Sequence, residues 1–175
     1  MLSRAADVVL SFPVLVVILT LVSVVGPNIF NVMMVIGLLY WPTFFRLIRA
    51  EILKVKEYDF INAARAVGCT NFNIMFRHLL PNVMAPVVVG ATLQMATAIL
   101  TEAALSFLGM GVQPPIASWG NMLMDAQSLT VLSQRPWLWL PPGIMISLTV
   151  LSINFVGDGL RDAMDPRTYS STKGD

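Results

Sequence analysis

Hydrophobic residues gather in long stretches that are almost free of charged side chains. Four stretches follow one another along the chain: residues 8–25, 29–45, 83–109 and 137–156. The first has 14 Val, Leu, Ile and Phe residues among 18 positions, and the third contains one charged residue, Glu102. Apolar stretches of about 18 residues or more are typical of membrane-spanning helices. The pattern therefore predicts an all-α, polytopic membrane protein with four spans.

The composition agrees with this prediction. Of the 175 residues, 56% are hydrophobic and 12% are charged, whereas soluble domains carry about 25% charged residues. An apolar run near the N-terminus also resembles a signal peptide. A first span is favoured because the run is long, lacks a following small-residue cleavage site and precedes further apolar stretches.

Basic residues predict how the chain is oriented. Segment 46–82 contains six Lys and Arg residues, segment 101–136 contains only Arg135, and the turn at 26–28 contains none. Since cytoplasmic loops are rich in Lys and Arg, segment 46–82 is expected inside, together with both termini. Residues 26–28 and about 110–136 are then expected outside. The basic residues of the C-terminal tail are Arg161, Arg167 and Lys173.

The cytoplasmic segment 46–82 has helix signals of its own. Asp59 is a candidate N-cap for a helix over residues 60–67, with Gly68 just beyond its C-terminus. Eight residues make a helix of about 12 Å, which is unstable unless it lies against something. Asn71 is expected to cap a second helix that ends before Pro81.

The spacing of this segment resembles a known motif. The chain has Asn62-Ala63-Ala64, three residues, Gly68, nine residues and then His78-Leu79-Leu80-Pro81. Permease subunits of prokaryotic ABC importers share Glu-Ala-Ala, three residues, Gly, nine residues and Ile-x-Leu-Pro. Asn62 replaces the Glu and His78 replaces the Ile. These forms are similar to those of the dipeptide, oligopeptide and nickel branch.

Two further stretches resemble the same branch. One covers residues 102–120 and includes Ser118-Trp119-Gly120, and the other covers residues 154–167. The resemblance extends over almost the whole chain. Because family members have about six spans, it implies that the first two spans and their external loop are missing here. An incomplete sequence, an internal start and a natural short form all fit that expectation.

The resemblance implies a permease subunit in a prokaryotic inner membrane. It would import dipeptides or oligopeptides, with nickel or another small solute as the alternative. Its expected partners are a second permease, two ATPase subunits and an external solute-binding protein. The chain has no Gly-x-x-x-x-Gly-Lys-Ser/Thr phosphate loop, so ATP would be used by the partners and this chain is expected to bind no cofactor.

The short helix near residues 62–68 resembles the coupling helix that docks on an ATPase subunit. Its apolar side chains, from Phe60 to Val67, are expected to be exposed for that contact. The alternative is an amphipathic helix that rests on the membrane surface. The predicted docking residues are Tyr58, Asp59, Asn62, Ala63, Ala64, Arg65, Gly68 and Pro81.

Glu102 is the ionisable residue of the third apolar stretch and is expected near the outer side. It lies about 28 Å along a helix from Val83, near the outer interface. One interpretation makes it part of a translocation gate or a substrate contact. The other is a structural hydrogen bond that fixes the turn before Leu105 and Phe107.

Other classes of function fit the sequence less well. A net charge of +1 lacks the basic surface that nucleic-acid binding needs. One cysteine, Cys69, and one histidine, His78, give no zinc-type cluster. An enzyme built on Glu102, Asp125 and His78 would need groups from both sides of the membrane. An ion-coupled transporter needs paired ionisable groups within its spans, and the spans offer none before Glu102. An inactive fragment is the remaining alternative.

Overall fold

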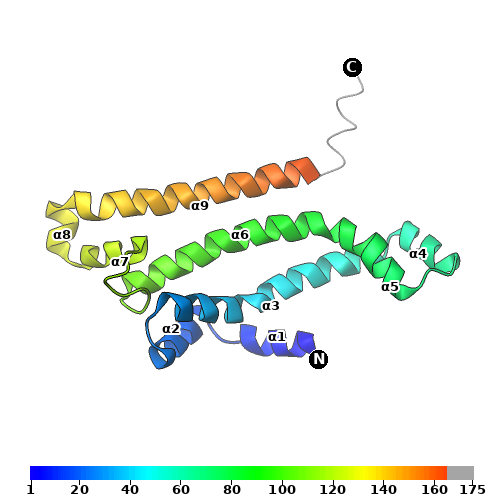
Figure 1. The fold of residues 1–175 in the computed structure, drawn as a ribbon, viewed down its shortest axis with the longest axis horizontal. Coiled ribbons are helices and arrows are strands. Elements are labelled where there is room, and N and C mark those ends of the chain that lie inside the picture. The colour runs from blue at the N-terminus through cyan, green and yellow to red at the C-terminus, as the bar shows by residue number, and fades with distance from the viewer. Residues whose placement is uncertain (165–175) are drawn as a thin grey trace, which may run out of the picture.

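Three long helices form the body of the molecule. The computed structural model describes residues 1–164, which contain helices and no strand. The helices long and apolar enough to cross a membrane are α3 (Ile29–Lys56), α6 (Leu80–Phe107) and α9 (Pro136–Met164). Each is roughly 42–44 Å long, which exceeds the hydrocarbon core of about 30 Å. Figure 1 shows α6 in the middle, in contact with α3 and with α9. The predicted all-α membrane fold is confirmed.

Short helices occupy the two opposite ends of this body (Figure 1). One end holds α4 (Asp59–Ala66), α5 (Asn71–Asn73) and the π-helix η1 (Ile74–Leu79). The other end holds α7 (Trp119–Met124), the 3₁₀ helix η2 (Asp125–Gln127) and α8 (Leu129–Gln134). The segment with the coupling motif and the segment predicted to face outside therefore lie at opposite ends of the long helices.

The first apolar stretch is not one continuous helix. It divides into α1 (Leu2–Leu10) and α2 (Val14–Val25), which meet at an angle of 88°. Pro13 has no N–H and disfavours helical geometry at the preceding residue, which breaks the helix here. Alone, α2 is about 18 Å long and too short to cross a bilayer. The stretch 8–25, predicted as one span, is therefore two helices, which together form a broken span or a re-entrant loop.

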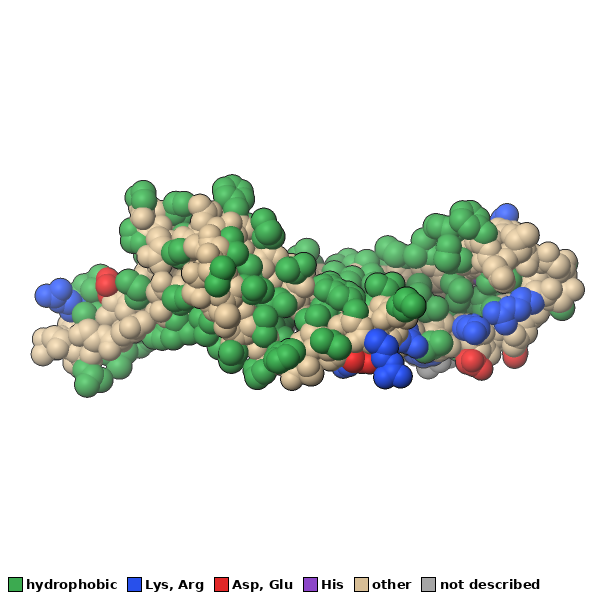
Figure 2. Space-filling view, turned by 90° about the horizontal axis from the view of Figure 1, so that it is seen from below, with side chains coloured by type: hydrophobic (Ala, Val, Ile, Leu, Met, Phe, Trp, Pro, Cys, Tyr) green, Lys and Arg blue, Asp and Glu red, His purple; other side chains and the backbone are tan. Residues whose placement is uncertain are grey.

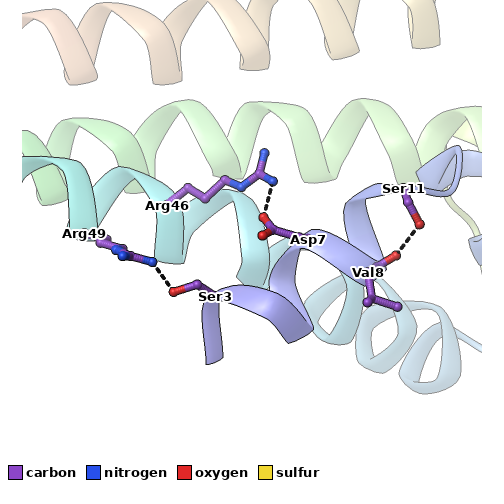
Figure 3. A network of polar contacts seen from close by, with 6 residues as sticks. All are labelled: Ser3, Asp7, Val8, Ser11, Arg46 and Arg49. Carbon is purple, nitrogen blue, oxygen red and sulfur yellow. Dashed lines mark hydrogen bonds and ion pairs between the residues drawn. The ribbon is translucent and has the colours of Figure 1, made fainter. Parts of the chain in front are cut away.

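Polar contacts attach α1 to the side of α3 (Figure 3). Arg46 donates to Asp7 over 2.6 Å, and Arg49 donates to Ser3. Both side chains of the ion pair are more than half exposed, so the pair contributes little to stability. Arg46 and Arg49 lie on α3 itself, because this helix continues eleven residues beyond the predicted span 29–45.

The helix expected to end before Pro81 does not end there. Thr70, rather than Asn71, provides the N-cap of α5, and helical structure then continues without a break through η1 and α6 to Phe107. In a regular α-helix the ring of Pro81 would clash with the carbonyl four residues earlier. The wider π-helical turn lies directly before this proline. It allows the chain to pass from the coupling segment into the membrane as one helix.

Apolar packing and one hydrogen bond connect the elements near the second end. Buried residues of α2, α3 and α6 form a common cluster: Ile18, Val22, Val32, Val35, Ile36, Leu39 and Leu105. The hydroxyl groups of Tyr40 and Thr101 lie 2.8 Å apart. Thr101 donates to the carbonyl of Thr97, so Tyr40 is the donor to Thr101.

The outer surface of the body is apolar, as a lipid-facing surface requires. Figure 2 shows hydrophobic side chains spread along one face, with most of its charged side chains in the middle and at the α4 end and a few at the α8 end. The last motif, residues 154–167, begins within α9. Its final residues Asp165, Pro166 and Arg167, like the tail residue Lys173, lie outside the described residues.

The contact between α6 and α9 gives a stability prediction. Gly157 is buried, and a Cβ added there would collide with the hydroxyl of Thr92. Gly157→Val should therefore destabilise the chain by about 1–3 kcal/mol, the usual cost of overpacking. In thermal unfolding in detergent the midpoint should fall by roughly 2–10 °C. The matched control is Gly159→Val, where no atom lies within 4 Å. Equal midpoints for the two variants would contradict the packing of α6 on α9.

Candidate functional site

The coupling segment begins with α4, which starts one residue earlier than expected. Tyr58 is its N-cap and makes no side-chain capping bond, whereas Asp59 is the first helical residue. The prediction of Asp59 as N-cap is therefore wrong by one position. Asp59 in the first turn and Arg65 in the last turn both oppose the partial charges of the helix ends.

Gly68 ends α4 through a Schellman turn. The Gly68 N–H donates to the Arg65 carbonyl over 2.9 Å, and the Cys69 N–H donates to the Ala64 carbonyl over 3.1 Å. This pair of hydrogen bonds needs a residue in the left-handed conformation, and Gly68 has a φ of +85°. The prediction that Gly68 lies just beyond the helix end is confirmed.

One residue of α4 attaches the helix to the rest of the protein. Ile61 is fully buried, as are Val55 near the end of α3 and Ile74 at the start of η1. Helix α4 contacts η1, and η1 contacts α3. The expectation that Ile61 belongs to the exposed apolar face is wrong, because this side chain supplies the burial that a helix of eight residues needs.

Other apolar side chains of the segment remain exposed. Val67 is 85% exposed and Phe60 is 39% exposed. Sequence reasoning missed two further members, Phe72 and Phe76, whose rings lie 4.6 Å apart and are 70% and 50% exposed. Their i, i+4 spacing places them on one helix face, which is the signal that would have found them. We call these four residues the coupling patch.

The other predicted docking residues divide into two groups. Asn62, Ala63 and Arg65 are exposed on α4, and Ala64 is partly buried. Pro81 is also exposed but lies in the first turn of α6. His78 lies between the groups, with its ring 6.5 Å from the ring of Phe60. The docking role of all these residues stays a prediction.

At the opposite end, α6 stops at a second Schellman turn. Gly109 has a φ of +78° and donates to the Ser106 carbonyl over 3.0 Å, while Met110 donates to the Leu105 carbonyl over 2.9 Å. The chain reverses here into the loop that leads to α7.

Glu102 takes part in the bonds that hold this reversal. The buried Ser106 hydroxyl accepts the Val112 N–H over 2.9 Å and donates its own proton to Glu102 Oε1 over 2.6 Å. Gly111 must be a glycine, since a Cβ there would lie 2.5 Å from the Ser106 nitrogen. Glu102 therefore has a structural hydrogen bond, but the bond fixes the turn after Phe107 rather than the turn before Leu105.

The loop returns the chain onto α6 as α7. Ser118 and Asn121 form a reciprocal capping box that starts this helix, with bonds of 3.2 and 3.1 Å. A Cβ on Gly120 would lie 2.6 Å from the Ala103 carbonyl oxygen, so the two helices meet at backbone distance. Helix α7 is thereby held beside Glu102.

A cavity of about 620 Å³ lies between α3, α6 and the start of α7. Such a volume is within the usual range for small-molecule sites. Its lining is apolar except for Glu102 and Ser118. The lining residues are Ile29, Met33, Ile36, Ala98, Ile99, Glu102, Ala117, Ser118, Trp119 and Met122.

The positions of the ionisable residues argue against the enzyme alternative. His78 belongs to η1 and Glu102 to the far part of α6, so 24 helical residues, or about 36 Å, separate them. A catalytic group and its partner must approach to about 3 Å. His78 and Glu102 therefore do not form one site.

The hydroxyl of Ser106 gives a second prediction. Ser106→Ala leaves the buried Val112 N–H without its acceptor, at a cost of about 1–3 kcal/mol. Hydrogen exchange at the Val112 amide should therefore accelerate by about tenfold or more. Ser147→Ala is the matched control, because that exposed hydroxyl bonds only within α9. Unchanged exchange at Val112 would contradict the role given to Ser106.

Known proteins match the chain along nearly all of its length. The model of the binding-protein-dependent transport system inner membrane component family matches residues 1–169. A protein of Brucella ovis named as a peptide permease is 52% identical over 94% of this chain and 54% of its own length. A dipeptide transport system permease protein of Alkalihalophilus pseudofirmus is 44% identical over 97% of this chain and 55% of its own length.

The chain thus spans about half the length of these relatives. The family description and the long apolar helices make it a multi-pass inner-membrane protein. The match covers both the coupling segment and the loop between α6 and α7. The chain belongs to the family of binding-protein-dependent transport system inner membrane components.

Proposed function

We propose that this chain is the membrane-spanning part of an ATP-driven importer for peptides. The names of its relatives support the substrate class, since they include a peptide permease and a dipeptide transport permease. The observation that carries the proposal is the geometry of α4. This short helix lies beyond the ends of three membrane-length helices (Figure 1). Apolar side chains are exposed there.

The coupling patch is suited to contact a protein partner. Its members Val67 and Phe72 are 85% and 70% exposed, although they lie at a polar, charged end of the molecule. Exposed apolar groups with a polar rim mark interaction surfaces. Tyr58, Asp59 and Arg65 provide such a rim. The proposed partner is an ATPase subunit, which would bind α4 at this end.

The orientation in the membrane follows from the basic residues. The α4 end carries Lys54, Lys56, Arg65 and Arg77, whereas the α7–α8 end is followed only by Arg135. This asymmetry supports a cytoplasmic α4 end and an external α7–α8 end. The N-terminus and the C-terminal tail would then be cytoplasmic, as predicted.

The complete transporter would contain several chains. A second permease, two ATPase subunits and an external solute-binding protein are the proposed partners. ATP would be bound by the ATPase subunits rather than by this chain. Their closure would move α4, and the attached helix from η1 to α6 would transmit the movement into the membrane, switching access from one side to the other.

Gly68 tests the docking role. Gly68→Val places a β-branched side chain at φ +85°, which costs about 1–2 kcal/mol and disturbs the end of α4. No atom lies within 4 Å of the added Cβ, so the defect is one of backbone conformation alone. ATP-dependent uptake of a dipeptide by the reconstituted complex should fall by about tenfold.

The conservative variant is Gly68→Asn, because asparagine tolerates the left-handed conformation. It should retain most of the uptake, and both variants should insert in the membrane in equal amounts. Normal ATP-dependent dipeptide uptake by the Gly68→Val variant would contradict the assignment of α4 as the docking helix.

A further inference from the structure

The larger cavity, of about 620 Å³, has the acidic side chain of Glu102 in its wall and no basic side chain. Glu102 is the one ionisable residue in the cavity lining, and neither ion pair of the described residues involves it. Its hydrogen bond with Ser106 engages Oε1. Among residues 1–164, Oε2 has no hydrogen-bond partner. The carboxylate is thus held in place by one oxygen and has the other free for a donor.

The surroundings of this carboxylate define what kind of donor fits. Ile29, Met33 and Ile36 of α3 face Ala98 and Ile99 of α6 across the cavity, which opens to the outside of the described chain. The rest of the wall is formed by Ala117, Ser118, Trp119 and Met122. A ligand that fills this space must therefore present a cationic group to Glu102 and an apolar group to the remaining wall.

A neighbouring cavity provides the contrast. It has a volume of about 390 Å³, lies between α6, α7 and α9, and is lined by residues such as Leu100, Phe107 and Ile146. None of its lining residues is charged. The two cavities share α6 and α7 and differ in the carboxylate, so a cationic ligand should distinguish them.

We infer that the larger cavity binds the free amino terminus of a peptide, with Glu102 receiving the ammonium group and the apolar wall receiving the first side chain. This inference rests on the proposed function, since it places one subsite for the proposed substrate. Charge complementarity carries it. An ammonium group donates charge-assisted hydrogen bonds to a carboxylate. A neutral, acetylated terminus cannot make these charge-assisted bonds.

Protection of an introduced cysteine tests the inference in the assembled complex. Met33→Cys, made together with Cys69→Ser, places a single thiol of this chain in the cavity wall. The rate of its reaction with N-ethylmaleimide is measured with increasing leucyl-alanine or N-acetyl-leucyl-alanine, without the solute-binding protein. Leucyl-alanine should protect at a concentration about tenfold lower than its acetylated form.

Two variants provide the controls. Glu102→Gln retains a carbonyl oxygen for Ser106 but loses the charge, so the two peptides should then protect to within about twofold of each other. Leu100→Cys, in the same Cys69→Ser background, places the thiol in the neighbouring cavity. Neither peptide should protect it.

The outcomes separate this inference from the proposed function. Uptake of leucyl-alanine by the same complex with its binding protein is measured in parallel, and its absence would overturn both. If uptake occurs, equal protection by both peptides, or none by either, would overturn the cavity inference alone. The cavity inference would also be overturned if the Glu102→Gln variant still showed stronger protection by leucyl-alanine than by its acetylated form.

Discussion

In the hydrocarbon core of a bilayer, each backbone N–H and C=O must find its partner within the protein, and that constraint governs this chain. It favours long helices as the way across, and in α3, α6 and α9 it confines irregular backbone to the two ends. Both Schellman turns, at Gly68 and at Gly109, lie at those ends. At each turn the chain leaves helical geometry while the last carbonyls remain bonded. The two functional candidates, α4 and the Glu102 cavity, are built beside these turns.

The helix from η1 through α6 joins the two candidates. It begins in contact with α4, and its far part contains Glu102 and Ser106. The helix is continuous past Pro81, so in the proposed mechanism a displacement of α4 would be passed to one continuous helix. Close contacts then tie this helix to its neighbours, with Gly120 against Ala103 and Gly157 against Thr92. Packed, contiguous elements of this kind are one way in which coupling between distant sites is carried.

Much of the architecture could be predicted from the pattern of the sequence. Long stretches almost free of charged residues predicted the three long helices, and the position of Gly68 predicted where α4 ends. The local failures have local causes. Pro13 breaks the first stretch into two helices, while Pro81 does not break the helix that contains it. A proline lacks the backbone N–H in both places, but of the two only Pro81 is preceded by a π-helical turn. No residue pattern predicted that turn.

The site was predictable to a similar degree. Spacing identified α4 and marked Glu102 as unusual, because charges in apolar helices are costly. It did not reveal that Ile61 is buried, since both faces of α4 carry apolar residues and only contact with η1 decides between them. Nor did it reveal the bond from Val112 to Ser106, which depends on how the loop folds back. Tertiary contacts of this kind leave no periodic trace in the sequence.

If the long helices cross the membrane as proposed, the coupling patch and the α7–α8 end lie on opposite sides of it. Two exposed positions test this arrangement most directly: Val67, 85% exposed beside α4, and Leu129, 82% exposed at the start of α8. Val67→Cys and Leu129→Cys, each with Cys69→Ser, are treated with a membrane-impermeant maleimide. In membranes that lack the ATPase subunits, which would otherwise cover the coupling patch, the Val67→Cys variant should react only in inside-out vesicles. The Leu129→Cys variant should react only from the outside of intact cells. Reaction of both thiols from the same side would contradict the account.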